Sequence, residues 1–384
     1  MKMDFNEIDF SSWKHFFKRK ESSSVGVDVG SDSIKIVELE KKSDRLALKN
    51  YALVAVNKNL VRLGTNKHLI NDISGELARK VFEKLKIKNR KINLAIPGFA
   101  SLITTVNLDA ASVKEAQKIL ELEASKFIPL PLEEVVYDWQ IIEEKSKSKQ
   151  EEKPENKKKD LSQNQQAKGK NQKAVIVAIM KEISQQYERI FETNGFEINT
   201  LEIDSFSLVR SLVDGNELDN YVILDIGGRV CNIIVTHQQN LIINKNVNVA
   251  GYRITDAISR SMGVESERAE KMKIQQGLNI EVKQLREQAI EPVLGIIVEE
   301  LEKSLNVFKK NYPEERIKGV ILSGGTSKMI GLVEYLKNKT GMEILIGNPW
   351  SRIDYPDGLK DKLTELAPSF AVATGLAMLG FDED

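Results

Sequence analysis

Apolar and polar residues alternate along several short stretches of the chain, and apolar residues recur every three or four positions along others. Alternation is typical of half-buried strands, whereas the longer spacing is typical of amphipathic helices. Alternation up to Asp28, a glycine–serine turn and renewed alternation from Ile34 predict a β-hairpin over residues 25–39. A third strand is predicted over 46–56, and a helix over 69–85.

A small strand–helix–strand–strand unit is predicted farther along. Residues 102–108 alternate, 113–127 have helical spacing, and 135–142 and 173–180 alternate again. Between the last two strands, residues 145–172 consist mainly of Lys, Glu, Gln, Asn and Ser. Such a segment buries too little apolar surface to offset the entropy of ordering, so we expect a disordered loop.

The rest of the chain predicts further strands and helices. A helix over 183–194 precedes a strand over 198–203, and a second helix follows through Leu208 and Leu212. Residues 265–276 and 282–312 have helical spacing over long stretches, which predicts a subdomain made of helices.

The first hairpin contains residues suited to an anion and a cation. Its turn includes Gly30, Ser31 and Ser33, and small turn residues let backbone N–H groups point into one concavity. Asp28 at the strand end can hold a hydrated Mg²⁺, and Lys35 can add positive charge for a phosphate. The same residue types also form ordinary hairpin turns, so this stretch alone does not decide between the two.

A second copy of the hairpin changes the interpretation. Residues 221–235 repeat the pattern, with Asp225 matching Asp28, Gly227 matching Gly30, and Gly228 in the turn. An internal repeat of this kind indicates two similar domains, each offering one hairpin and one carboxylate.

A third glycine turn lies between a predicted strand and a predicted helix around Leu332. It contains Gly324, Gly325 and Thr326, and Met329 follows. Glycines before a helix N-terminus let a flat ring or a phosphate approach the backbone.

The three turns in this order resemble the first phosphate loop, second phosphate loop and adenosine loop of the actin-like ATPase superfamily. Residues 269–277 resemble the Ala-Glu-x-x-Lys-x-x-x-Gly segment of its bacterial members, which implies that Glu270 and Lys273 reach ribose and adenine. Gly251, at a predicted helix start, falls near the ribose in that family, and 367–377 resembles the small-residue helix at the hinge.

The resemblance implies an α/β fold with duplicated actin-like (RNase H-like) domains that bind ATP and Mg²⁺ between them. Asp28 and Asp225 would hold the Mg²⁺ through water. Asp32 departs from the small residue usual in the first loop: aimed at a phosphate its carboxylate would weaken binding, and aimed outward it would be harmless. Asn232 matches a position where some actins place a side chain near the attacking water.

The small inserted unit is similar to that of the FtsA and PilM branch, and Pro129-Leu130-Pro131 resembles the PilM pattern. The implied organisation is a leader at 1–24; a first actin-like domain at 25–90, 182–220 and 355–384; an inserted strand-helix-strand-strand subdomain at 91–181; and a second actin-like domain at 221–354, with helices at about 264–316.

A PilM-like protein is expected to be a cytoplasmic ATP-binding adaptor of the type IV pilus assembly platform. The inserted subdomain and its neighbour would grip the cytoplasmic N-terminal tail of a PilN-like membrane protein. Contacts with pilus assembly motor ATPases and self-association are further expectations. Hydrolytic superfamily members often carry Gln or Glu at the first connecting segment, expected near 92–98. Pro97, Gly98 and Phe99 offer no such side chain, so we expect at most a slow ATPase.

Three alternatives stay open. An FtsA-like division protein usually ends in an amphipathic membrane helix, whereas this chain ends in an acidic segment at 380–384. A cytoplasmic scaffold of a type II secretion platform usually continues into a transmembrane helix. A sugar kinase of the same superfamily would carry a catalytic Asp in the first domain and would lack the inserted unit.

Composition narrows the class of protein and its compartment. Lys plus Arg and Asp plus Glu are both 56, so no net charge attracts the chain to nucleic acid. One cysteine, Cys231, and three histidines argue against a disulfide framework or a zinc site and for a reducing compartment. We expect a cytoplasmic protein, peripheral to the inner membrane through partners. Aromatic and basic residues in the leader fit either a surface-lying helix or a frayed end.

Overall fold

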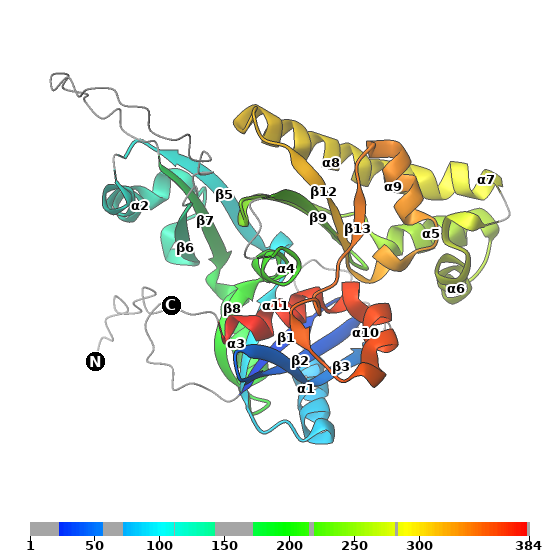
Figure 1. Ribbon diagram of the computed structural model, residues 1–384, viewed down its shortest axis with the longest axis horizontal. Coiled ribbons are helices and arrows are strands. Elements are labelled where there is room, and N and C mark those ends of the chain that lie inside the picture. The colour runs from blue at the N-terminus through cyan, green and yellow to red at the C-terminus, as the bar shows by residue number, and fades with distance from the viewer. Residues whose placement is uncertain are drawn as a thin grey trace, which may run out of the picture.

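The computed structural model describes residues 23–56, 72–110, 112–142, 172–214, 219–280 and 283–381. These residues form three sheets of six, five and three strands (Figure 1). The expectations for the leader and for the polar loop at 145–172 fall almost wholly outside the described residues. None of the described helices is both long and apolar enough to span a bilayer.

The first sheet has the strand order β14-β3-β2-β1-β4-β8. An antiparallel meander is followed by parallel strands, because β1 pairs with β2 in antiparallel and with β4 in parallel fashion. The strands are β1 (Ser23–Val29), β2 (Ser33–Lys42), β3 (Arg45–Ala55), β4 (Lys91–Ile96), β8 (Glu197–Ile203) and β14 (Ile353–Asp354). One face packs against α1 (Asp72–Leu85) and α3 (Lys181–Glu192), and the other against α10 (Lys360–Leu366) and α11 (Ala371–Leu379).

The second sheet repeats this arrangement in the order β11-β10-β9-β12-β13. Again an antiparallel meander is followed by parallel strands. The strands are β9 (Asn220–Ile226), β10 (Cys231–His237), β11 (Asn240–Val247), β12 (Ile317–Ser323) and β13 (Ile344–Ile346). The helices are α5 (Gly251–Met262), α6 (Ser266–Gln276), α7 (Lys283–Leu285), α8 (Glu291–Asn311) and α9 (Leu332–Thr340). The helical stretch predicted over 282–312 is confirmed over residues 283–311, where a π-helical turn at Arg286–Ile290 lies between α7 and α8.

The third sheet is the inserted unit, with the order β5-β7-β6. It contains β5 (Ser101–Leu108), β6 (Val135–Ile142) and β7 (Gln172–Met180), and α2 (Val113–Phe127) packs against it. The predicted insertion at 91–181 therefore starts too early, because β4 lies in the first sheet between β1 and β8. The chain also returns to the first sheet at Ile353, two residues before the predicted return at 355.

Helices α4 (Asp204–Leu212) and α11 pack closely together between the two large sheets (Figure 1). A Cβ atom on Gly375 would lie 2.0 Å from the Ser207 carbonyl oxygen, and one on Gly26 would lie 2.1 Å from the Ala373 carbonyl oxygen. Only glycine allows backbones to approach this closely. These two glycines fix α11 against α4 on one side and β1 on the other.

Candidate nucleotide site

The first hairpin places Asp28 opposite Lys35 on neighbouring strands. Lys35 Nζ lies 3.0 Å from Asp28 Oδ2, and each side chain is 15% exposed. The turn between them is closed by a 3.0 Å hydrogen bond from the Gly30 N–H to the Ser33 carbonyl. Lys35 is therefore paired with Asp28, and a bound phosphate or Mg²⁺ would rearrange or share this ion pair.

Asp225 ends the matching strand of the second domain. Burial raises its pKa to about 6; the negative charge of Asp28 adds to this, while a hydrogen bond from Ser323 opposes it. The Asp28 and Asp225 carboxylates, one from each large sheet, thus repel each other, which concentrates negative charge between the hairpins.

Asp204, at the start of α4, is a site residue that the sequence analysis missed. Its Oδ1 accepts hydrogen bonds from the Gly98 N–H at 3.0 Å and from Ser205 Oγ at 3.1 Å. Burial and then the charge of Asp225 raise its pKa to about 7, against the lowering effect of these two donors. A carboxyl group with such a pKa can exchange a proton near neutral pH.

Pro97, Gly98 and Phe99 themselves supply no Gln or Glu side chain, but the Asp204 carboxyl from another element bonds to the Gly98 N–H. Residues 92–98 lead from β4 into the inserted unit rather than to the second domain. The chain passes to the second sheet after α4, so α4 belongs to the segment that connects the two large sheets. Asp204 is the first residue of this helix. Asp204 and Gly98 are 106 residues apart in sequence, and only the pairing of β4 with β8 brings them together.

Asparagines from the second domain face Asp204. Asn232 Nδ2 donates a 3.2 Å hydrogen bond to Asp204 Oδ2, and Asn244 Oδ1 accepts one of 3.0 Å from Ser205 Oγ. Asn232 Oδ1 and Asn246 Oδ1 are buried without a protein hydrogen-bond partner among the described residues. Buried polar atoms of native proteins are nearly always satisfied, so this cluster is chemically suited to hold water.

The second and third turns meet at the start of α5. The Gly227 carbonyl accepts hydrogen bonds from Thr326 Oγ1 at 2.9 Å and from the Gly251 N–H at 3.1 Å. Gly324 has φ of 83°, and a Cβ atom on it would lie 2.4 Å from the Ile226 carbonyl oxygen. A Cβ on Gly325, in contrast, would meet no atom within 4 Å, which leaves open space beside this turn.

Two other predicted residues, Glu270 and Lys273, lie on α6 and contact α5. Lys273 is 7% exposed and donates hydrogen bonds to the Gly251 carbonyl at 3.2 Å, Thr255 Oγ1 at 3.1 Å and Glu270 Oε2 at 2.9 Å. Glu270 also accepts a hydrogen bond from Thr255. The pair is therefore both an ion pair within α6 and a neighbour of the glycine turns.

Met329 is a predicted site residue whose side chain lies in the hydrophobic core. Its side chain is 6% exposed and packs in the core of the second domain. Its N–H bonds to the Thr326 carbonyl at 3.0 Å, which is its link to the third turn.

Asp32 points neither outward nor toward its own turn. It accepts a hydrogen bond from the hydroxyl of Tyr252, the second residue of α5 in the other domain. Asp32, which departs from the usual small side chain, therefore takes part in the contact between the first hairpin and the second domain.

A family model described as type IV pilus assembly protein PilM matches residues 26–381, which includes both hairpins, the inserted unit and the hinge helices. The chain belongs to the PilM family. A solved structure titled PilM-PilN type IV pilus biogenesis complex has a TM-score of 0.72 and 22% identity, and covers 94% of this chain and 99% of that chain. MreB5 of Spiroplasma citri bound to ADP has a TM-score of 0.50 and 10% identity, and covers 93% and 95%.

Curated relatives of this PilM family member match over a shorter length. The cell division protein FtsA of Pseudomonas aeruginosa is 25% identical over 232 residues, which cover 55% of this chain and 54% of that protein. The chain spans about half the length of the curated relatives it matches. The predicted PilM resemblance and the duplicated actin-like α/β fold are confirmed.

Proposed function

We propose that this PilM family member is a cytoplasmic adaptor of the type IV pilus assembly platform. It binds Mg-ATP in the cleft between its duplicated domains and the cytoplasmic N-terminal tail of a PilN-like protein at its inserted unit. The observation that carries the proposal is the family match over residues 26–381, which spans both proposed sites. This adaptor would be peripheral to the inner membrane through that partner.

The cleft chemistry supports Mg-nucleotide binding. The residues proposed to contact it are those of the three turns and of α6, namely Asp28, Gly30, Ser31, Ser33, Lys35, Asp225, Gly227, Gly228, Gly251, Glu270, Lys273, Gly324, Gly325, Thr326 and Met329. Mutual repulsion contributes to the raised pKa of Asp225, and a divalent cation near Asp28 and Asp225 would relieve that repulsion. MreB5, a protein of the same fold, has a solved structure with bound ADP.

Slow hydrolysis is part of this proposal. Asp204 and Asn232 lie on the side of Asp225 where they can hold a water and accept its proton. With a pKa of about 7, Asp204 is protonated in a large fraction of molecules at neutral pH, which limits it as a base.

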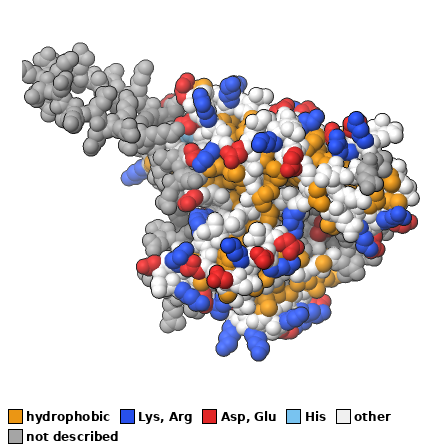
Figure 2. Space-filling model, turned by 45° about the vertical axis from the view of Figure 1, so that its right-hand side comes forward, with side chains coloured by type: hydrophobic (Ala, Val, Ile, Leu, Met, Phe, Trp, Pro, Cys, Tyr) orange, Lys and Arg blue, Asp and Glu red, His pale blue; other side chains and the backbone are white. Residues whose placement is uncertain are grey.

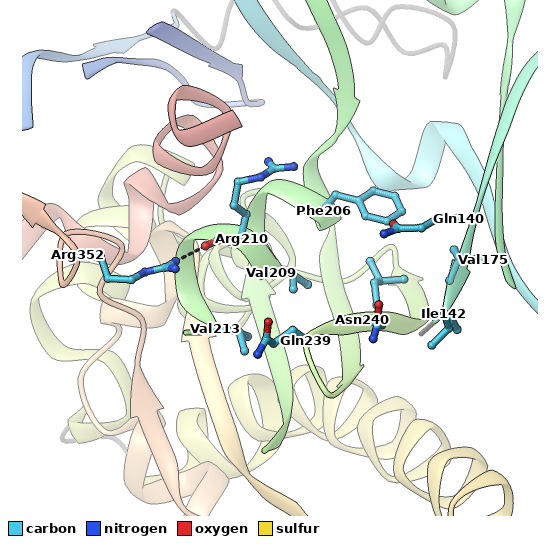
Figure 3. Close-up of a pocket in the computed structure, with 11 residues that line it drawn as sticks. Gln140, Ile142, Val175, Phe206, Val209, Arg210, Val213, Gln239, Asn240 and Arg352 are labelled. Carbon is cyan, nitrogen blue, oxygen red and sulfur yellow. Dashed lines mark hydrogen bonds between the residues drawn. The ribbon is translucent and has the colours of Figure 1, made fainter. Parts of the chain in front are cut away.

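The tail site is supported by a cavity of about 300 Å³ where the inserted unit meets its neighbours (Figure 3). Apolar and amide side chains both line it, a combination suited to an extended peptide. Arg210 points away from the cavity, and Arg352 donates a hydrogen bond to the Arg210 carbonyl at its edge. The lining residues are Gln140, Ile142, Val175, Phe206, Val209, Arg210, Val213, Gln239, Asn240, Leu241 and Arg352.

An edge strand lies beside this cavity. β6 contributes Gln140 and Ile142 to the lining, and its one strand neighbour among the described residues is β7. Unpaired backbone groups of an edge strand are a template for an extended peptide. Apolar side chains also reach the surface among the charged ones on the face shown in Figure 2. Contacts with motor ATPases and self-association stay predictions.

The test is titration of the full chain with a synthetic peptide of the PilN-like tail. We expect a Kd of roughly 10 µM or tighter. Gln140→Trp puts a large side chain at the cavity from an exposed strand position, and we expect it to weaken peptide binding about tenfold or more. Glu197→Trp, at an exposed position on the edge strand β8, is the matched control and should leave the affinity unchanged.

Failure of the tail peptide to bind the unmodified chain would contradict the adaptor role. Equal losses in Gln140→Trp and Glu197→Trp would contradict the placement of the tail at this cavity. The nucleotide half of the proposal is tested separately by Mg-ATP titration.

A further inference from the structure

Asp32 forms a bridge between the two halves of the cleft. It lies in the turn of the first hairpin, which is closed by the Gly30 to Ser33 hydrogen bond, so its backbone is fixed. Its partner Tyr252 is fixed on the second domain, because the Tyr252 N–H donates a 2.8 Å hydrogen bond to the Gly228 carbonyl. The Tyr252 hydroxyl then donates to Asp32.

The side chain of Asp32 also fills the space directly above the second turn. A Cβ atom on Gly228 would lie 2.4 Å from Asp32 Oδ2 and 2.8 Å from Ser31 Oγ. The first and second turns thus touch through Asp32 and Ser31. A group passing between these turns has to displace this carboxylate or lie against it.

The lysine beside the hairpin turn pairs with another carboxylate and not with Asp32. Lys35 pairs with Asp28 at the base of the hairpin. Burial and the hydrogen bond to Asp32 raise the pKa of Tyr252, so its hydroxyl stays protonated and remains a donor. Tyr252 therefore holds Asp32 in place as an uncharged donor, and the nearby cation is Arg229 of the second turn, whose charge acts on the pKa of Tyr252 in the lowering direction.

We propose that Asp32, held by Tyr252, is a specificity-determining residue that makes the cleft favour a nucleoside diphosphate over the triphosphate. The inference rests on the proposed nucleotide site. A phosphate chain bound by both turns runs between them, and each added phosphate brings negative charge and volume toward the Asp32 carboxylate. Like charges brought together in a partly buried site repel strongly. The triphosphate binds fully only when the Asp32–Tyr252 hydrogen bond has opened.

The test compares the affinities of the full chain for Mg-ADP and Mg-ATP by calorimetry, with two variants that separate charge from position. Asp32→Asn keeps an acceptor for Tyr252 but removes the charge. Tyr252→Phe removes the donor and lets the carboxylate turn toward solvent. Asp44→Asn, an exposed acid in the β2–β3 turn, and Tyr335→Phe, whose hydroxyl bonds to the Glu291 carbonyl, are the matched controls.

We expect Asp32→Asn to shift the ratio of the two affinities toward ATP by about tenfold or more, with little change for ADP. Tyr252→Phe should shift it in the same direction by a smaller factor, and the two controls should leave it unchanged. An unchanged ratio in Asp32→Asn would overturn the inference. A shift in Asp32→Asn without one in Tyr252→Phe would overturn the role given to Tyr252. If neither nucleotide binds the unmodified chain or any variant, the proposed nucleotide site itself is wrong.

Discussion

Asn232 Nδ2 donates a 3.2 Å hydrogen bond to Asp204 Oδ2 and so joins the second sheet to the helix that leads out of the first domain. Asn232 also lies directly opposite Asp225 in the pairing of β10 with β9. The two carboxyl groups with raised pKa values therefore flank one amide. The stability of the fold therefore depends on the protonation of Asp204 and Asp225.

Stability should fall as pH rises from about 4 to about 7. The ordinary pKa of an Asp side chain is 3.8, whereas folding raises that of Asp204 to about 7 and that of Asp225 to about 6. In this window the folded state binds more protons than the unfolded state, so the free energy of unfolding decreases with pH. Below pH 4 both states are protonated, and above pH 7 the decrease ends.

Thermal or urea unfolding between pH 4 and pH 8 measures this dependence. We expect Asp204→Asn to reduce the pH-dependent change in the free energy of unfolding by about 1 to 3 kcal/mol. One unit of pKa shift corresponds to about 1.4 kcal/mol, and partial solvation of the carboxyl group makes the effect smaller. Asp44→Asn, an exposed acid, should run parallel to the unmodified chain. Parallel curves for Asp204→Asn and the unmodified chain would show that Asp204 is not a buried, destabilising carboxyl group.

The packing of α11 on α4 predicts an asymmetry between two glycines. Gly375→Ala would place a Cβ atom 2.0 Å from the Ser207 carbonyl oxygen, so the helices must separate. We expect a loss of about 2 kcal/mol or more in the free energy of unfolding. On α8, a Cβ atom on Gly295 would meet no atom within 4 Å. Gly295→Ala should therefore raise the free energy of unfolding by up to about 1 kcal/mol. Equal effects in a denaturant titration would contradict the close contact of α4 with α11.

Glu270 tests the nucleoside end of the proposed site. Its side chain is 24% exposed and contacts Lys273 and Thr255. We expect Glu270→Gln to weaken Mg-ATP binding about threefold to tenfold by removing a charge-assisted hydrogen bond, and to leave Mg-triphosphate binding unchanged. Glu267→Gln is the control on the same helix, because Glu267 pairs with Lys271 on the exposed side. Equal weakening for ATP and triphosphate would show that Glu270 acts only through the fold.

Local patterns in the sequence predicted most of the elements, because each depends on residues close in the chain. The inserted unit shows this well: its helix was predicted over 113–127 and its strands within a residue of those observed. The three glycine turns were also predicted together, since a strand, a turn and a carboxylate form a local motif.

What the sequence did not show depends on pairings between distant segments. β4 has the alternation of any strand, and nothing local assigns it to the first sheet rather than to the inserted unit. Asp204 follows a strand at a helix start, a common position, and its role emerges from its contact with Gly98. Asp32 is unusual already in the sequence, but its partner Tyr252 is 220 residues away.

The central claim is that the cleft binds Mg-nucleotide through the duplicated carboxylates. Calorimetric titration of the full chain with Mg-ATP, alongside Asp28→Ala and the control Asp44→Ala, tests it most directly. We predict measurable binding that Asp28→Ala weakens by about tenfold or more, equivalent to about 1.4 kcal/mol, and that Asp44→Ala leaves unchanged. No binding to the unmodified chain, or equal affinity in Asp28→Ala, would contradict the claim.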